Sequence, residues 1–134
     1  MQTETDETLP LRTSDDVVRV RQAVRARAVA SGFSLVDQTK VITAASEIAR
    51  NTIDYGGGGT LRLVVVRNGQ RRGIRLTFVD QGPGIADVTL AMKDGYSTGS
   101  GLGLGLSGAK RLSNEFDIHS APGQGTIVTL ARWT

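Results

Sequence analysis

The sequence predicts an α+β fold: a two-layer α/β sandwich in which helices lie on one face of a mixed, mostly antiparallel β-sheet. Apolar residues recur at helical spacing early in the chain, over residues 14–31 and 35–54. Alternating or β-branched apolar segments, which are typical of strands, follow. The expected strands cover residues 61–66, 74–79, 116–120 and 125–133. Because helices and strands come in runs, the pattern favours a two-layer α+β arrangement.

The length of 134 residues allows one domain of ordinary size and no second core. We expect residues 1–7 to form a disordered acidic tail and residues 8–134 to form the domain. No apolar run approaches the roughly 18 residues that a membrane helix needs, so we expect no membrane contact. The chain has no cysteine, which excludes disulfides, thiol catalysis and cysteine-bound zinc. Together these features predict a cytoplasmic protein.

Four arginines, at positions 19, 21, 25 and 27, gather in one short segment of a chain whose formal net charge is +3. Such a cluster raises the question of nucleic-acid binding. The alternative is a solvated helix face on which arginine stems cover apolar neighbours. The chain has only three Phe, two Tyr and one Trp, too few for an evident base-stacking platform. We therefore favour the solvated face.

The N-terminal elements have recognisable ends. A short strand is expected over residues 8–13, where Pro10 would restrict it to a sheet edge. Ser14 is expected to cap the first helix. Ser34 is expected to begin the second helix with a capping box, and that helix should end at Tyr55, before four consecutive glycines.

The second half of the chain begins with a hairpin. Asn68-Gly69 starts the turn between its two strands. Residues 81–105 are rich in glycine and have no sustained period, so we expect a long loop there, followed by a helix over residues 106–114. A loop of that length inside a small domain is usually functional.

One face of the second helix carries polar side chains. At about 100° per residue, Glu47, Asn51 and Asp54 fall on one face, with Arg50 beside them. The Asn51 oxygen is a suitable hard ligand for Mg2+, which keeps several waters and bridges phosphates. The Glu47 carboxylate, one turn earlier, has the chemistry of a general base. The alternative is a solvated polar stripe stabilised by pairing of Glu47 with Arg50.

The segment Asp80-Gln-Gly82-Pro-Gly84-Ile85 directly follows the second hairpin strand. Its glycines let the backbone approach a flat ring closely, since they have no Cβ. An ionised Asp accepts hydrogen bonds only, so Asp80 suits an exocyclic amine such as that of adenine. The alternative is an ordinary strand-ending turn, because Asp, Gly and Pro are standard turn residues.

A second glycine-rich segment runs from Gly99 to Gly108 into the last expected helix. Backbone N–H groups of such a loop, together with a helix N-terminus, can hold phosphate. The spacing matches neither the dinucleotide fingerprint, which needs a preceding βαβ strand, nor a P-loop, which needs Gly-Lys-Ser/Thr. A flexible linker fits poorly because leucines alternate with the glycines. The order of the three polar and glycine-rich segments is more specific than any one of them.

In this order the segments resemble the GHKL superfamily, which includes gyrase B, MutL and sensor histidine kinases. The resemblance covers roughly residues 8–133 and implies the Bergerat ATP-binding fold, with residues 86–98 as a flexible ATP lid. Residues 47–54 resemble the family's N box, residues 80–85 its G1 box, and residues 99–105 its G2 box.

Carried over position by position, the resemblance implies ATP and Mg2+ as ligands. Glu47 would be the catalytic base and Asn51 the Mg2+ ligand, and either Arg50 or Lys93 would contact the γ-phosphate. Asp80 would bind the adenine amine and share a water with Thr126. The other expected nucleotide contacts are Asp54, Gly82, Gly84, Ile85, Gly99, Ser100, Gly101, Leu102, Gly103, Leu104 and Gly105.

The similarity extends to small stand-alone kinases that control bacterial sigma factors by partner switching, and within them to the RsbT-type switch kinases of the stressosome. The most specific matching stretch is residues 101–117. The resemblance implies a serine/threonine-protein kinase that phosphorylates STAS-domain proteins in stress-response signalling. Such a kinase would also bind and activate a PP2C-type phosphatase when released.

Missing features separate the related classes. Gyrase- and MutL-type ATPases need a second domain that supplies a lysine, and sensor kinases need a helical histidine-bearing domain. His119 lies in an expected strand and is interpreted as structural. One alternative is an anti-sigma factor that sequesters a sigma factor, although the lid lacks the arginine-bearing segment of those proteins. A second is a non-catalytic ATP-binding regulatory module, which would have no need for Glu47 and Asn51.

Overall fold

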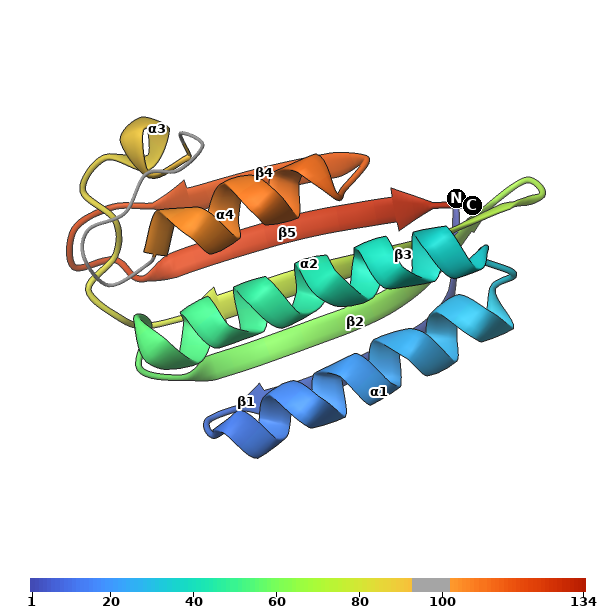
Figure 1. Ribbon diagram of the computed structural model, residues 1–134, viewed down its shortest axis with the longest axis horizontal. Helices are drawn as coiled ribbons and strands as arrows, with labels where there is room; N and C mark the ends of the chain where they lie inside the picture. The colour runs from blue at the N-terminus through green and yellow to red at the C-terminus, as the bar shows by residue number, and fades with distance from the viewer. Residues whose placement is uncertain (93–101) are drawn as a thin grey trace.

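The fold is a two-layer α/β sandwich, as the sequence predicted (Figure 1). The computed structural model describes residues 1–92 and 102–134. In chain order the elements are β1 (Gln2–Leu11), α1 (Ser14–Ala30), α2 (Leu35–Asp54), β2 (Gly59–Asn68), β3 (Arg71–Asp80), α3 (Val88–Ala91), α4 (Leu102–Arg111), β4 (Glu115–Ser120) and β5 (Thr126–Trp133). Helices α1, α2 and α4 lie side by side on one face of the sheet (Figure 1).

The described strands form one sheet in the order β1-β2-β3-β5-β4, and every neighbouring pair is antiparallel. The expectation of a mixed sheet is therefore corrected for the described chain. Two helices, α1 and α2, connect β1 to β2, so the chain reverses direction an extra time and β2 runs antiparallel to β1. A single connecting helix would have made this pair parallel.

The first strand is longer than the sequence predicted. Residues 2–7, expected to form a disordered tail, belong to β1 and pair with β2, so that expectation is wrong for them. Their acidic side chains pair with arginines from other elements: Glu4 with Arg72 at 2.8 Å, and Glu7 with Arg27 at 3.1 Å. These partners are distant in sequence, so no local pattern indicates them. β1 is an edge strand, as Pro10 predicted.

Helix α1 begins one residue away from the predicted cap. Thr13 is the N-cap, and Ser14 is the first helical residue. The buried Asp16 carboxylate closes this end, because its Oδ2 accepts hydrogen bonds from the backbone N–H groups of Arg12 at 2.8 Å and Thr13 at 3.2 Å. These bonds hold the pKa of Asp16 below its usual value. The Asp16 carboxylate, and not the predicted serine hydroxyl, therefore provides the hydrogen-bond acceptor for backbone N–H groups at this end of the helix.

The boundaries of α2 and the position of the hairpin turn agree with the sequence prediction, whereas the two hairpin strands extend beyond the expected residues 61–66 and 74–79. The Ser34 Oγ accepts a hydrogen bond from the Asp37 N–H at 3.1 Å, and the helix ends with Tyr55 as its C-cap. In the hairpin, Asn68 pairs with Arg71 across a two-residue turn. Gly69 has φ +66°, a conformation that glycine adopts at little cost.

The glycine-rich segment contains more helix than expected. Instead of a loop throughout residues 81–105, the described parts contain α3 and the first turn of α4, which begins at Leu102 and not at residue 106. Glycine disfavours a helix by about 1 kcal/mol relative to Ala, which is why the sequence favoured a loop. The packing of α4 against α2, with Leu106 and Ala109 buried, offsets this cost.

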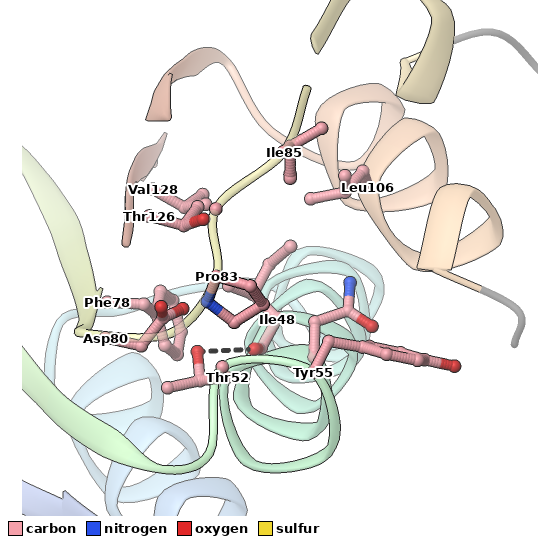
Figure 2. A pocket seen from close by; sticks show the side chains of 13 residues that line it. Ile48, Thr52, Tyr55, Phe78, Asp80, Pro83, Ile85, Leu106, Thr126 and Val128 are labelled. Carbon is pink, nitrogen blue, oxygen red and sulfur yellow. Dashed lines mark hydrogen bonds between the residues drawn. The ribbon is translucent and has the colours of Figure 1, made fainter. Parts of the chain in front are cut away.

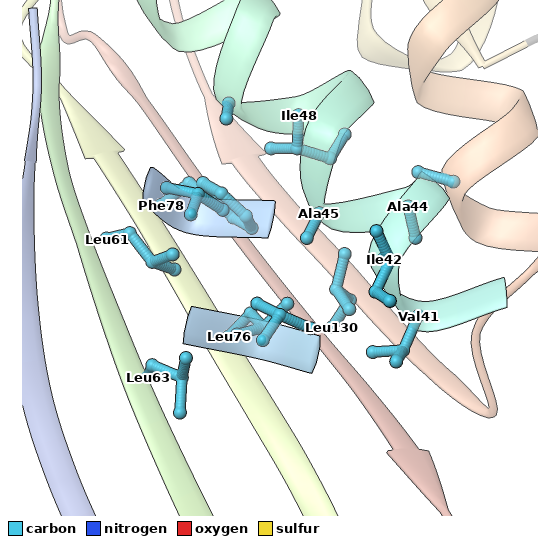
Figure 3. Packing of buried hydrophobic residues seen from close by; sticks show 14 of the residues in the cluster. Val41, Ile42, Ala44, Ala45, Ile48, Leu61, Leu63, Leu76, Phe78 and Leu130 are labelled. Carbon is cyan, nitrogen blue, oxygen red and sulfur yellow. The ribbon is translucent and has the colours of Figure 1, made fainter. Parts of the chain in front are cut away.

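The hydrophobic core lies between the sheet and its helices. Figure 3 shows side chains of α2 facing those of β2, β3 and β5, including Ile48, Leu63, Phe78 and Leu130. All four are almost completely buried. In the described part of the chain, no helix is both long enough and apolar enough to span a lipid bilayer.

We predict that an ion pair between the helical layer and the sheet makes stability depend on acid pH. Arg132 Nη2 donates to Asp37 Oδ1 at 2.8 Å, which lowers the pKa of Asp37 below 3.8. The pair therefore contributes fully above pH 3.8, the value in the unfolded chain, and loses its contribution as the pH falls through the folded-state pKa. Asp37→Asn should lower the free energy of unfolding at pH 7 by about 1 kcal/mol.

Denaturant unfolding at pH 7 and at pH 3 measures this effect. The exposed first-turn residue Asp15 provides the control for the helix-dipole contribution that both carboxylates share, since Asp15→Asn should remove that contribution but no partly buried ion pair. The difference between Asp37→Asn and the original chain should shrink at pH 3. An equal difference at both pH values would contradict the prediction.

Candidate functional site

A pocket opens between α2, the end of β3 and the middle of the sheet (Figure 2). Its walls are mainly apolar, with Ile48 from α2, Phe78 from β3 and Leu106 from α4. Its volume is about 180 Å³. This is below the 300–1,000 Å³ typical of a site for a whole drug-sized ligand. The space that the described residues enclose therefore suits a flat apolar ring, which would be only one part of a larger ligand.

The predicted residue Asp80 provides a polar end to this pocket. It is the last residue of β3 and is only 8% exposed. Its Oδ1 accepts a hydrogen bond from the Gly82 N–H at 2.9 Å, which orients the carboxylate. An ionised carboxylate can only accept hydrogen bonds, so this end of the pocket suits a ligand with an N–H donor.

Close backbone packing holds the turn that follows Asp80. A Cβ on Gly56, just after α2, would lie 2.4 Å from the Asp80 Cγ, and one on Gly82 would lie 2.7 Å from the Gly56 Cα. Gly84 has φ +76° and would place a Cβ against the Ala121 carbonyl. The predicted G1-like residues Gly84 and Ile85 line the pocket as a result.

Thr126 lies beside Asp80, as the resemblance implied, because the two residues are register partners across β3 and β5. Thr126 also lines the pocket. Its Oγ1 lies 2.8 Å from the Oγ of Ser120, the last residue of β4. Sequence reasoning missed Ser120, and the only signal for it was a polar residue between a strand and an Ala-Pro-Gly turn.

Glu47 and Asn51 lie where α4 packs on α2. A Cβ on Gly105 would be 2.9 Å from Asn51 Nδ2 and 3.4 Å from Glu47 Oε2. Asn51 lines the pocket, and its buried Nδ2 has no hydrogen-bond partner within the described residues. Leaving a buried polar group unsatisfied costs about 1–3 kcal/mol, so this amide is a strong candidate for ligand contact.

Arg50 and Asp54 do not line this pocket. Both are exposed and line a separate groove between α1 and α2. The face of α2 that lines the pocket is therefore not the predicted polar face. Its positions follow the helical spacing i, i+3, i+4 and i+7, counted from Ile48. These positions are Ile48, Asn51, Thr52 and Tyr55. Tyr55 is thus a pocket residue that the sequence interpretation missed, although its spacing from Asn51 could have indicated it.

The predicted phosphate-binding segment is only partly described. Gly99, Ser100 and Gly101, and the lid residue Lys93, lie outside the described residues. Leu102, Gly103 and Leu104 form the first turn of α4, which Gly105 continues. The N-terminal turn of this helix therefore lies next to Glu47 and Asn51, where its dipole favours negative charge.

The amide oxygen of Asn51 fits a Mg2+ ion that arrives with a phosphate ligand. The Glu47 carboxylate lies beside it as the candidate general base. Across residues 1–92 and 102–134, no group of three or more His, Cys, Asp or Glu side chains could hold a metal ion by itself. Mg2+ commonly uses one or two protein ligands together with waters and substrate phosphates, so the small donor set agrees with it.

Comparison with known proteins identifies relatives across nearly the whole chain. The family described as histidine kinase-, DNA gyrase B-, and HSP90-like ATPase matches residues 36–133. The chain is 42% identical to serine/threonine-protein kinase RsbT of Bacillus subtilis over 123 residues, which are 92% of each protein. It is 25% identical to an anti-sigma F factor of a Thermoanaerobacter species over 119 residues, covering 84% of this chain and 82% of that protein.

The fold also resembles a solved structure. The crystal structure of the RsbU and RsbW domains of a Mycobacterium tuberculosis protein superposes with a TM-score of 0.64 at 18% sequence identity. The match covers 96% of this chain and 32% of that one. At this identity the likeness concerns the fold alone.

We predict that Gly56 and Gly108 respond oppositely to an added methyl group. Gly56→Ala should destabilise the fold by about 1–3 kcal/mol, because the new Cβ would overlap the Asp80 carboxyl and the Thr52 carbonyl oxygen. A Cβ on Gly108, inside α4, would meet nothing within 4 Å. Gly108→Ala should therefore stabilise the protein by up to about 1 kcal/mol. Denaturant unfolding measures both, and a Gly56→Ala variant as stable as the original chain would rule out the close packing.

Proposed function

The chain belongs to the histidine kinase-, DNA gyrase B-, and HSP90-like ATPase family, and from this premise we propose that it is an ATP-dependent serine/threonine-protein kinase of a partner-switching pathway. The observation that carries the proposal is the juxtaposition of Glu47, Asn51 and Gly105 at the N-terminal turn of α4, next to the pocket that ends at Asp80. The 42% identity to a serine/threonine-protein kinase supports it.

ATP would bind with its adenine in the apolar pocket. The exocyclic amine would donate a hydrogen bond to Asp80, and Gly84 and Ile85 would pack on the ring. The phosphates would extend toward α4, where backbone N–H groups of the predicted Gly101–Gly105 segment and the helix dipole stabilise negative charge. A Mg2+ ion held by Asn51 would neutralise charge on the phosphates when bound.

The reaction would transfer the γ-phosphoryl group to a protein hydroxyl. The Ser or Thr oxygen attacks phosphorus as the bond to the ADP oxygen breaks, and the Glu47 carboxylate accepts the hydroxyl proton. Most of the rate enhancement in phosphoryl transfer comes from positioning and charge stabilisation. The contact of Glu47 and Asn51 with α4 supports this assignment, since it brings the base and the phosphate-binding helix together.

The proposed substrates are STAS-domain proteins, and the proposed second partner is a PP2C-type phosphatase. The family resemblance and the similarity to RsbT support both. An anti-sigma activity is the second candidate, because the chain is also 25% identical to an anti-sigma F factor over most of its length. The greater identity to the kinase favours phosphorylation as the primary role.

We predict that substitution of the general base lowers the rate of phosphotransfer, whereas substitution of the nucleotide-binding carboxylate lowers the affinity for ADP. Glu47→Gln should lower phosphotransfer by about 100- to 10,000-fold while ADP affinity stays unchanged, because the amide cannot accept the proton. Asp80→Asn should instead weaken ADP binding, since it replaces an acceptor oxygen with a donor. Calorimetry with ADP and radiolabel transfer measure the two effects, with Glu115→Gln, on β4, as a matched control. A Glu47→Gln enzyme of normal activity would refute the assignment of the base.

We predict that a STAS-domain protein, not a sigma factor, is the partner modified. Incubation with γ-labelled ATP should label Ser or Thr of a STAS-domain protein, and the Glu47→Gln variant should not label it. A parallel pull-down with sigma factors tests the second candidate. A stable, nucleotide-dependent complex with a sigma factor, without transfer to any STAS-domain protein, would favour the anti-sigma function.

A further inference from the structure

Ser120 joins two turns at the polar end of the pocket. Its Oγ accepts a hydrogen bond from the Ile85 N–H at 2.8 Å. The same oxygen lies 2.8 Å from the carbonyl oxygen of Gly125 and 2.8 Å from the hydroxyl of Thr126. Ile85 and Thr126 line the pocket, whereas Ser120 does not. Any effect of Ser120 on a ligand must therefore pass through these neighbours.

Counting protons around Ser120 settles the direction of its hydrogen bonds. A serine hydroxyl has one proton to donate and two lone pairs to accept with. The Gly125 carbonyl can only accept, so it receives the Ser120 proton. The Ile85 N–H can only donate, so it takes one lone pair. The remaining lone pair must accept the proton of Thr126.

This count determines what Thr126 offers to a ligand. Because its only proton is directed at Ser120, the Thr126 oxygen can only accept hydrogen bonds from the pocket. Its register partner Asp80 is likewise an acceptor, with Oδ1 already taking the Gly82 N–H. The polar end of the pocket thus consists of two neighbouring acceptors. A ligand with a carbonyl oxygen at this place would face oxygen on both sides.

We propose that Ser120 is a positioning residue that makes the pocket selective for a purine with an amino group at C6 over one with a carbonyl oxygen there. It does so by holding the Thr126 hydroxyl as an acceptor. The bond of Ser120 to the Ile85 N–H fixes the adjoining turn and supports the binding of either nucleotide. This inference rests on the proposed nucleotide binding and adds a specificity determinant to the contribution of Asp80.

Contacts between the same two turns support the positioning role. The Gly123 N–H donates to the Pro83 carbonyl oxygen at 2.7 Å, and the Gly84 backbone packs against the Ala121 carbonyl. The turn between β4 and β5 therefore backs the turn that would contact the base. Within the described residues, Ser120 supplies the only side-chain hydrogen bond that links these turns.

The test compares ADP with IDP, which carries a carbonyl oxygen in place of the C6 amine and, with it, a proton on N1. Calorimetry on the full chain should show that it prefers ADP. Ser120→Ala should weaken ADP binding, and it should lower the ADP-to-IDP preference by about 2- to 10-fold, because the freed Thr126 hydroxyl can donate to a carbonyl oxygen. Ser120→Thr, which keeps the hydroxyl, should restore the preference. The control is Ser113→Ala, which loses a similar hydroxyl bond to the Ala109 carbonyl outside the pocket.

A double-mutant cycle identifies the route of the effect. In a Thr126→Val background, Ser120→Ala should leave the ADP-to-IDP preference unchanged, since the hydroxyl that it reorients is absent. Equal weakening of ADP and IDP by Ser120→Ala would overturn the proposal and leave Ser120 a purely structural role. If Ser120→Ala does not fold, Ser120→Cys takes its place in the test. It should lower the ADP-to-IDP preference in the same way, because a thiol of similar size is a weak hydrogen-bonding group. A folded chain that binds neither nucleotide would instead refute the proposed function itself.

Discussion

The site depends on how closely the backbone approaches Asp80. A Cβ on Gly56 would lie 2.4 Å from the carboxyl carbon, and one on Gly125 would lie 2.2 Å from the Asp80 carbonyl oxygen. The end of α2 and the turn before β5 can therefore enclose this residue only because both positions are glycine. The enclosure leaves Asp80 8% exposed, and its side chain still lines the pocket. A buried acceptor of this kind is favourable only with donors around it, so it selects the ligand that brings one.

The two ends of the site are built in different ways. At the base end, β3, β5 and β4 place Asp80, Thr126 and Ser120 in one row across the sheet. Backbone ladders fix this row, so small displacements are resisted. At the phosphate end, α4 contains several glycines and depends on its contact with α2 for helical structure. One of these glycines, Gly105, lets the first turn come close to Glu47 and Asn51. Helix α4 thus combines residues of weak helix propensity with a backbone that can approach a ligand closely.

Several parts of the fold and site could be predicted from local patterns. The cap at Ser34, the hairpin turn at Gly69 and the edge position of β1 follow from the chemistry of single residues, and the structure agrees with them. Asp80 could be assigned to the pocket because it ends a strand and begins a glycine-rich turn. By contrast, the strand formed by residues 2–7 depends on arginines far along the chain, such as Arg62 paired with Asp6. No local rule predicts such partners.

The sequence by itself determined the fold class, the ends of α2, the position of the hairpin turn and the types of chemical group available at the site. These follow from periodicity, capping and turn chemistry, which act over a few residues. Only the tertiary structure decided which groups meet. It turned α2 so that Asn51 and Tyr55 line the pocket while Arg50 and Asp54 line a different groove. It also placed Ser120 beside Thr126, because the rotation of a helix and the register of distant strands are set by packing across the whole core.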